Sequence, residues 1–193
     1  MKKSVTITLE IWRSLFKLET TIPLFHCNVP TTIQFLEKKK LIISDHPDDN
    51  SWGGRGMYFW DNEGNAKYWK TQKEKHNLST EILKIYVSFN YEDDLLDLTD
   101  LEQERMLEKI IKFVSSSPKT KYLSNADIGS KIDFFCEKFG VKLVKFFGKY
   151  PFTPNTSVIN SDDEKSKLTN KIKLIFCIKE GNDDLIKYTK KIE

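Results

Sequence analysis

The sequence is poor in cysteine and has no long apolar run, and each shortage excludes a class of protein. Its three cysteines, Cys27, Cys136 and Cys177, are an odd number without the spacing of metal ligands. This argues against a disulfide scaffold and a zinc site, and it fits a reducing cytoplasm. No apolar run approaches the roughly 20 residues that cross a bilayer, and residues 1–10 lack the apolar stretch of a secretory signal. We therefore expect a cytoplasmic protein with no membrane-spanning segment and no metal.

The chain is also poor in arginine. Only Arg13, Arg55 and Arg105 occur among 31 basic residues, which 28 acidic residues almost balance to a net charge of +3. The lysines are spread along the chain and mixed with acids, as on a solvated surface. The charge therefore indicates no nucleic-acid groove, although it does not exclude a nucleic-acid substrate.

The 193 residues, of which 39% are hydrophobic, suffice for one domain with one sizeable core. No internal repeat or linker divides them, so we expect a single domain over residues 1–193. Apolar alternation and helical spacing predict its elements. The predicted strands cover residues 5–9, 22–27, 41–43, 57–60, 82–89, 141–147 and 172–178, and one more ends at Asp97. The predicted helices cover residues 11–18, a short stretch from Pro30, and residues 62–74, 101–114 and 126–139.

This mixed order, with strands at both ends and helices between them, predicts an α+β fold with substantial antiparallel pairing. Residues 148–170 form a long polar loop that contains proline and serine. A loop of more than twenty residues inside a compact domain usually has a function or lacks order.

Three short motifs carry the functional information. Residues 25–28 read Phe-His-Cys-Asn at the end of a predicted strand. Residues 54–59 read Gly-Arg-Gly-Met-Tyr-Phe and enter the next strand, and residues 65–68 read Asn-Ala-Lys-Tyr on a predicted helix. The glycines allow close backbone approach in a turn, and the tyrosines offer flat faces for a ring.

In order and spacing these motifs resemble the catalytic core of the ADP-ribosyltransferase superfamily, in the branch of diphtheria toxin and the poly-ADP-ribose polymerases. That branch carries His-Gly-Ser/Thr, then Gly-x-Gly-Ile-Tyr-Phe, then Ser-Ala-x-Tyr. Residues 58–66 more closely resemble bacterial ADP-ribosyltransferase-like toxins and defence proteins, in which Tyr-Phe-Trp precedes Asn and Ala. The resemblance implies a single domain with its motif-bearing core at about residues 22–188. It also implies a split, mostly antiparallel β core with flanking helices.

The resemblance further implies NAD as the substrate. Splitting the bond between nicotinamide and ribose builds positive charge on the ribose, so the protein must hold both the ring and the sugar. Tyr58 and Tyr68 would stack on the two faces of the cationic ring. His26 would bond a ribose hydroxyl, while the Cys27 backbone and the Asn65 amide would bind the carboxamide.

The glycine turn has an implied role as well. Gly54 and Gly56 would let the backbone approach the dinucleotide. Arg55 is either a phosphate contact or a surface arginine, and the two readings have equal weight. Trp52 and Trp60 are expected to pack around this turn.

The third catalytic position departs from the family pattern. Relatives place Glu or Gln near the start of a late strand. Aligning residues 177–179 with the toxin-like Cys-Val-Arg pattern puts Ile175 there, so the implied catalytic set is His26, Tyr58 and Ile175. Relatives with a His-Tyr-Ile set are thought to borrow a carboxylate from the acceptor, and inactive relatives also lose the glutamate.

Two nearby sources of a substitute carboxylate have little support. Glu180 lies five residues beyond Ile175 and faces the other way in a regular strand. The acids Asp162, Asp163 and Glu164 would have to reach in from the long loop.

Three functions remain open at this stage. The first is a mono-ADP-ribosyltransferase that modifies a protein, RNA or DNA, as a toxin or defence effector that a cognate antitoxin would restrain. The second is an inactive module that binds a nucleotide or a protein. The third is an NAD hydrolase, which ranks below transfer because no carboxylate is placed to activate water.

Overall fold

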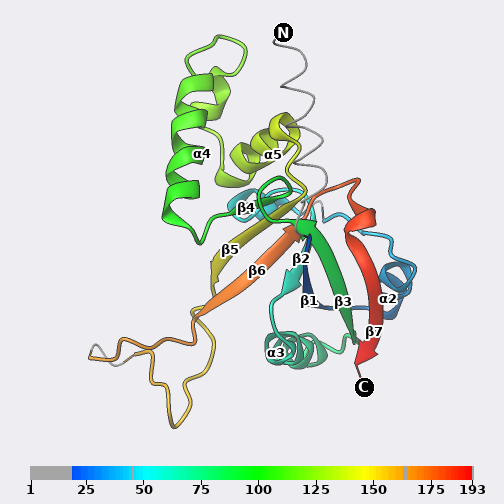
Figure 1. Cartoon of the computed structure of the whole chain (residues 1–193). Coiled ribbons are helices and arrows are strands. Elements are labelled where there is room, and N and C mark those ends of the chain that lie inside the picture. The colour runs from blue at the N-terminus through cyan, green and yellow to red at the C-terminus, as the bar shows by residue number, and fades with distance from the viewer. Residues whose placement is uncertain (1–18, 45, 163–164, 193) are drawn as a thin grey trace.

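One seven-stranded sheet forms the centre of the protein (Figure 1). The computed structural model describes residues 19–44, 46–162 and 165–192. The strand order is β4-β5-β6-β2-β1-β3-β7, and every neighbouring pair is antiparallel except β4 and β5. The strands are β1 (Glu19–Asn28), β2 (Met57–Trp60), β3 (Glu81–Asn90), β4 (Leu95–Asp97), β5 (Leu143–Lys149), β6 (Ile172–Ile178) and β7 (Ile186–Ile192). The sheet and its helices confirm the predicted α+β class.

The helices begin and end where the sequence favours it. They are α2 (Pro30–Glu37), α3 (Glu63–Glu74), α4 (Leu101–Val114) and α5 (Ile128–Phe139), with the short 3₁₀ turns η1 (Pro47–Ser51), η2 (Lys121–Ser124) and η3 (Asp183–Leu185). The side chains of Asn62 and Asp100 accept backbone N–H groups at the starts of α3 and α4. Gly140 ends α5 in the left-handed conformation, with φ 71°. The four predicted helices in the described residues are thus confirmed.

Opposite faces of the sheet bury separate hydrophobic cores, because successive side chains of a strand point to opposite faces. A smaller third cluster joins Ala66 of α3 to Phe25, Cys27 and Ile82. On β6, Phe176 and Ile178 belong to the core that α2 covers. Ile175 and Cys177 belong to the core that α4 and α5 cover. The alternation therefore gives one helix layer on each side of the sheet.

The structure differs from the predicted elements at two places within the described residues. Residues 41–43 form no strand, because the Leu41 N–H is bonded to the Asp183 carboxylate (2.7 Å), and the next residue, Ser44, makes only an isolated bridge with Gly56. Strand β7 was not predicted, since its sequence is mostly polar. The predicted strand at residues 5–9 and helix at residues 11–18 lie outside the described residues.

The sheet is joined most weakly between β1 and β2. These strands share one paired position, Phe25 with Trp60, whereas β1 and β3 pair over ten positions. Within this one continuous sheet, the strands on the two sides of the junction are called half-sheets, β4-β5-β6-β2 and β1-β3-β7. The loop between β5 and β6 extends well away from the sheet (Figure 1). No helix among the described residues has both the length and the apolar character to cross a membrane.

Candidate functional site

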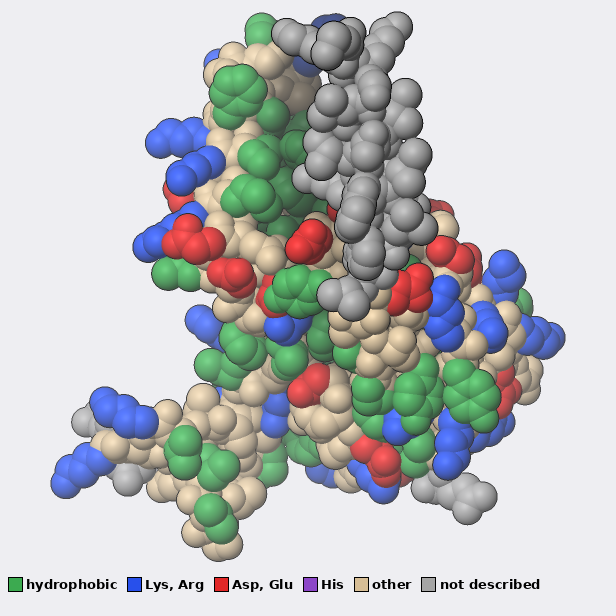
Figure 2. All heavy atoms as spheres, in the orientation of Figure 1, with side chains coloured by type: hydrophobic (Ala, Val, Ile, Leu, Met, Phe, Trp, Pro, Cys, Tyr) green, Lys and Arg blue, Asp and Glu red, His purple; other side chains and the backbone are tan. Residues whose placement is uncertain are grey.

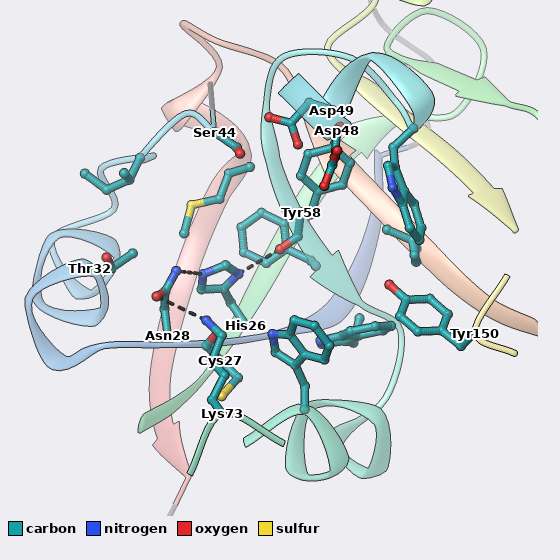
Figure 3. A pocket seen from close by; sticks show the side chains of 17 residues that line it. His26, Cys27, Asn28, Thr32, Ser44, Asp48, Asp49, Tyr58, Lys73 and Tyr150 are labelled. Carbon is teal, nitrogen blue, oxygen red and sulfur yellow. Dashed lines mark hydrogen bonds between the residues drawn. The ribbon is translucent and has the colours of Figure 1, made fainter. Parts of the chain in front are cut away.

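A cavity of about 430 Å³ opens where β1 and β2 diverge (Figure 3). Its walls come from β1, α2, residues 42–52, β2, α3, β6 and the start of the long loop. Of the residues that the sequence singled out, His26, Cys27, Tyr58 and Ile175 line it. The divergence of the two strands therefore brings together residues that are up to 149 positions apart in the sequence, from His26 to Ile175.

A row of hydrogen bonds crosses one side of this cavity (Figure 3). His26 Nδ1 lies 2.7 Å from the backbone carbonyl of Tyr58. Because a carbonyl only accepts, Nδ1 carries the proton, and Nε2 accepts from the Asn28 amide at 3.2 Å. The Asn28 carbonyl oxygen accepts in turn from the Val29 N–H at 2.9 Å and from Lys73 Nζ at 3.4 Å. The row fixes both the tautomer and the orientation of the imidazole.

His26 is neutral in this setting. Burial lowers its pKa from 6.5 to about 4, which outweighs the opposite effect of the bond to Tyr58, and the nearby Lys73 lowers it further. Burial also lowers the pKa of Lys73 itself. A neutral imidazole is a hydrogen-bonding group and not a cation, so it suits contact with a hydroxyl.

Tyr58 is held at both ends of its side chain. Its ring packs edge-on against Phe146, with centroids 6.3 Å apart, and its hydroxyl donates to the Gly54 carbonyl. Burial raises the pKa of the phenol far above its ordinary value, so it stays protonated. Ile175 is 3% exposed and pairs with Trp60 across β2 and β6, where it forms an aliphatic wall.

Five further aromatic residues line the cavity, namely Trp52, Phe59, Trp60, Trp69 and Tyr150. Trp60 lies 5.2 Å from Tyr150 and 6.4 Å from Trp69, and Trp52 lies 5.6 Å from Tyr150, all between ring centroids. Trp52 and Trp60 pack against the core that α4 and α5 cover, and both also line the cavity.

Helix α3 presents a different residue to the cavity from the one expected. Trp69 and Lys73, one turn apart, line it, whereas Tyr68 and Asn65 do not. The Tyr68 hydroxyl is 3.5 Å from the Phe152 carbonyl, outside the cavity. The Asn65 amide donates to Asp61 at 3.3 Å. Of these two adjacent aromatic residues, Trp69 and not Tyr68 lines the cavity.

The glycine turn is shaped by its protein neighbours. Gly54, Arg55 and Gly56 do not line the cavity. A Cβ on Gly54 would collide with the Asp133 carboxylate, and one on Gly56 would collide with the Cys177 sulfur. The absence of a Cβ at these two positions is therefore required for packing against the protein itself, and their expected approach to a dinucleotide stays a prediction.

The Arg55 side chain and the Cys27 backbone carbonyl also have protein partners. Arg55 is exposed and lies 3.3 Å from Glu180, as expected for a surface arginine. The Cys27 carbonyl accepts from Lys73 Nζ at 3.4 Å. Burial raises the pKa of the Cys27 thiol, so it is a poor nucleophile.

The turn is clamped from outside by a buried cation. Lys179, at the end of β6, is 6% exposed. Its Nζ lies 2.5 Å from the Gly53 carbonyl, 3.0 Å from the Arg55 carbonyl and 2.6 Å from the Asp133 carboxylate. Asp133 accepts the Arg55 N–H as well. Helix α5 and strand β6 thereby fix the backbone whose Gly54 carbonyl holds Tyr58.

The carboxylates that line the cavity are Asp48 and Asp49, on η1. Sequence reasoning missed them because they lie in a stretch that reads only as a polar loop. Glu180 points elsewhere, to its surface partner. Asp162 pairs with a lysine within the long loop, and residues 163–164 lie outside the described residues.

Comparisons with protein-family models, curated proteins and solved structures find no match to this chain. The functional argument therefore rests on the residues of the cavity and on the motifs of the sequence.

Proposed function

We propose that this protein is a mono-ADP-ribosyltransferase that cleaves NAD and transfers ADP-ribose to a macromolecule. One observation carries the proposal. His26 and Tyr58, which the motifs pair, are joined by a hydrogen bond in an aromatic-lined cavity. A neutral imidazole and several ring faces are the groups that a ribose hydroxyl and a cationic ring require.

The proposed chemistry assigns each wall of the cavity a task. Tyr58 and Trp69 hold the nicotinamide ring, and His26 bonds a ribose hydroxyl. The glycosidic bond breaks with its electron pair leaving on nicotinamide, while the acceptor nucleophile bonds to the ribose carbon and releases its proton. Asp48 and Asp49 supply the negative charge that favours the cationic transition state, which the Ile175 side chain cannot supply.

The test uses NAD labelled on the adenylate, incubated with the pure protein and a lysate containing protein, RNA and DNA. We expect label on one fraction, together with nicotinamide release, and the loss of both in Tyr58→Ala and His26→Ala. Tyr122→Ala is the matched control, because Tyr122 is 62% exposed and does not line the cavity. Equal labelling by wild type and Tyr58→Ala would overturn the proposal.

A binding module without activity is the second candidate. Ile175 in place of a carboxylate favours it. The side chains of His26, Tyr58 and Lys73 also favour it, because they already form hydrogen bonds with other groups of the protein. Such a module would gain thermal stability with NAD and release no nicotinamide. An NAD hydrolase would release ADP-ribose without any acceptor.

We further propose that the protein acts in the cytoplasm as a toxin or defence effector that a cognate antitoxin restrains. The three cysteines are buried and unpaired, which suits a reducing compartment. Expression should be toxic, and Tyr58→Ala should relieve the toxicity. Equal toxicity of the two proteins would count against an effector role.

A further inference from the structure

A second surface with a distinct chemistry lies on the half-sheet β1-β3-β7. Tyr86 of β3 stands directly opposite Tyr188 of β7, and Lys84 stands directly opposite Lys190. The tyrosine ring centroids are 5.9 Å apart. These four residues, two residues apart along each strand, are called the tyrosine–lysine face below.

This face is open to solvent. Tyr188 is 60% exposed and Lys190 is exposed, while Lys84 and Tyr86 are partly buried beside them. The alternate residue Ile85 points to the opposite side, into the core that α2 covers. Figure 2 shows hydrophobic side chains bordered by basic ones in the region of β3 and β7. The tyrosines thus present ring surface to solvent next to two amines.

The charge of the tyrosine–lysine face is uncompensated. Like charges directly opposite each other on a sheet destabilise it. Among the residues that the structure describes, neither Lys84 nor Lys190 forms an ion pair. Lys84 Nζ instead lies 4.9 Å from the Tyr86 ring centroid. The acids on these strands have other partners: Glu81, at the start of β3, pairs with Lys191 at 3.0 Å, and Glu19, at the start of β1, accepts the Ser88 hydroxyl at 2.9 Å. An anion between the two amines would relieve their repulsion.

We propose that the tyrosine–lysine face binds single-stranded nucleic acid. Exposed aromatic rings on which bases stack, beside amines that meet phosphates, are the elements of such sites. Rows two residues apart on a strand are separated by about 6.6 Å, so one nucleotide reaches both a ring and an amine. An acidic peptide would pair with the two lysines but would have no flat ring to stack on the tyrosines. Under the proposed function, the bound strand is the acceptor of ADP-ribose.

The test measures binding of a fluorescein-labelled 12-nucleotide RNA of mixed sequence to the full chain, by anisotropy and without NAD. Tyr188→Ala should weaken binding by about 5- to 100-fold through lost stacking. Lys190→Gln should lower the slope of log affinity against log salt by about 0.7, because one phosphate contact is lost. Tyr122→Ala and Lys109→Gln, at exposed positions on the helical side, should bind as wild type does.

Three outcomes would overturn the proposal: no binding at low salt, equal binding by the Tyr188→Ala and Tyr122→Ala variants, or equal binding of a glutamate-rich peptide of the same length. The last would indicate an acidic protein partner. Because the assay contains no NAD, failure of the proposed enzymatic function leaves its result intact, and failure of RNA binding leaves NAD cleavage to be judged separately. Thermal melting of each variant confirms that it is folded.

Discussion

Single residues decide what the cavity can do, and His26 is the clearest case. Its two ring nitrogens are committed to the Tyr58 carbonyl and the Asn28 amide. A ribose hydroxyl can reach Nε2 only when Asn28 turns aside. Lys73 holds Asn28 in place, so this lysine governs access to His26. The lysine is a positioning residue that sequence spacing did not identify.

The lowered pKa of His26 predicts a loss of stability in mild acid. The pKa of His26 is about 4 in the folded protein, below its ordinary value of 6.5, so the unfolded chain takes up the proton first. The free energy of unfolding should therefore be fully retained above pH 6.5 and fall by up to about 3 kcal/mol as the pH drops to about 4. Urea denaturation at a series of pH values measures this fall. His26→Gln should flatten the curve over that window, and an unchanged curve would refute the assignment.

The orientation of α3 predicts unequal effects at two adjacent positions. Trp69→Ala removes a ring from the cavity wall and should weaken NAD binding about tenfold. Tyr68→Ala should leave NAD affinity unchanged, since this side chain points away. Isothermal titration with NAD compares the two variants. A larger loss with Tyr68→Ala than with Trp69→Ala would show that the helix is turned differently when ligand is bound.

At the level of single residues, the sequence motifs identified part of the candidate site. His26 and Tyr58 were found because both sit in motifs with a fixed relation to strand ends. Helical spacing predicts that Trp69 faces inward, as the structure has it, but it assigns Trp69 no role in the site, and Lys73 was missed because no motif includes it. Asp48 was missed because a loop's path cannot be derived from its composition.

Among the elements, the glycine turn depends on its neighbours more than on its own sequence. Lys179, just after β6, holds two of its carbonyls from 124 and 126 positions away in the chain, and Asp133 of α5 accepts the Arg55 N–H from 78 positions away. Contacts at such separations have no local sequence pattern. The sequence motifs therefore gave no indication of the role of these two residues.

The buried contacts of Lys179 and the exposed ion pair of Arg55 with Glu180 should contribute very different amounts to the free energy of unfolding. Lys179→Met leaves a partly buried carboxylate and two carbonyls without their cation, and should lower the free energy of unfolding by about 3 kcal/mol. Arg55→Ala breaks the ion pair with Glu180, in which both side chains are more than half exposed. This substitution should change the free energy of unfolding by less than about 1 kcal/mol. Urea denaturation at pH 7 measures both. Equal losses would contradict the burial of Lys179.

Strands with strong alternation were predicted within a few residues, as β3 shows. The exceptions share one physical cause, which is that pairing depends on partners and not on the strand alone. Residues 41–43 are apolar enough for a strand but are tied to η3 by the Leu41 N–H. β7 has a polar sequence, yet it pairs with β3 along the edge of the sheet.

For the whole molecule, the weak junction between β1 and β2 is the decisive feature. The cavity opens beside this junction, while opposite faces of the whole sheet bury separate cores. The α+β class followed from the order of elements. The position of the cavity could not be derived from that order, because it depends on how far β1 and β2 stay paired.

The most direct test of this account is a crystal structure with an NAD analogue that cannot be cleaved, in which carbon replaces the ribose ring oxygen next to nicotinamide. The account predicts the analogue in the cavity between β1 and β2, with its nicotinamide between Tyr58 and Trp69 and a ribose hydroxyl on His26. An analogue bound elsewhere, or none bound at millimolar concentration, would contradict it.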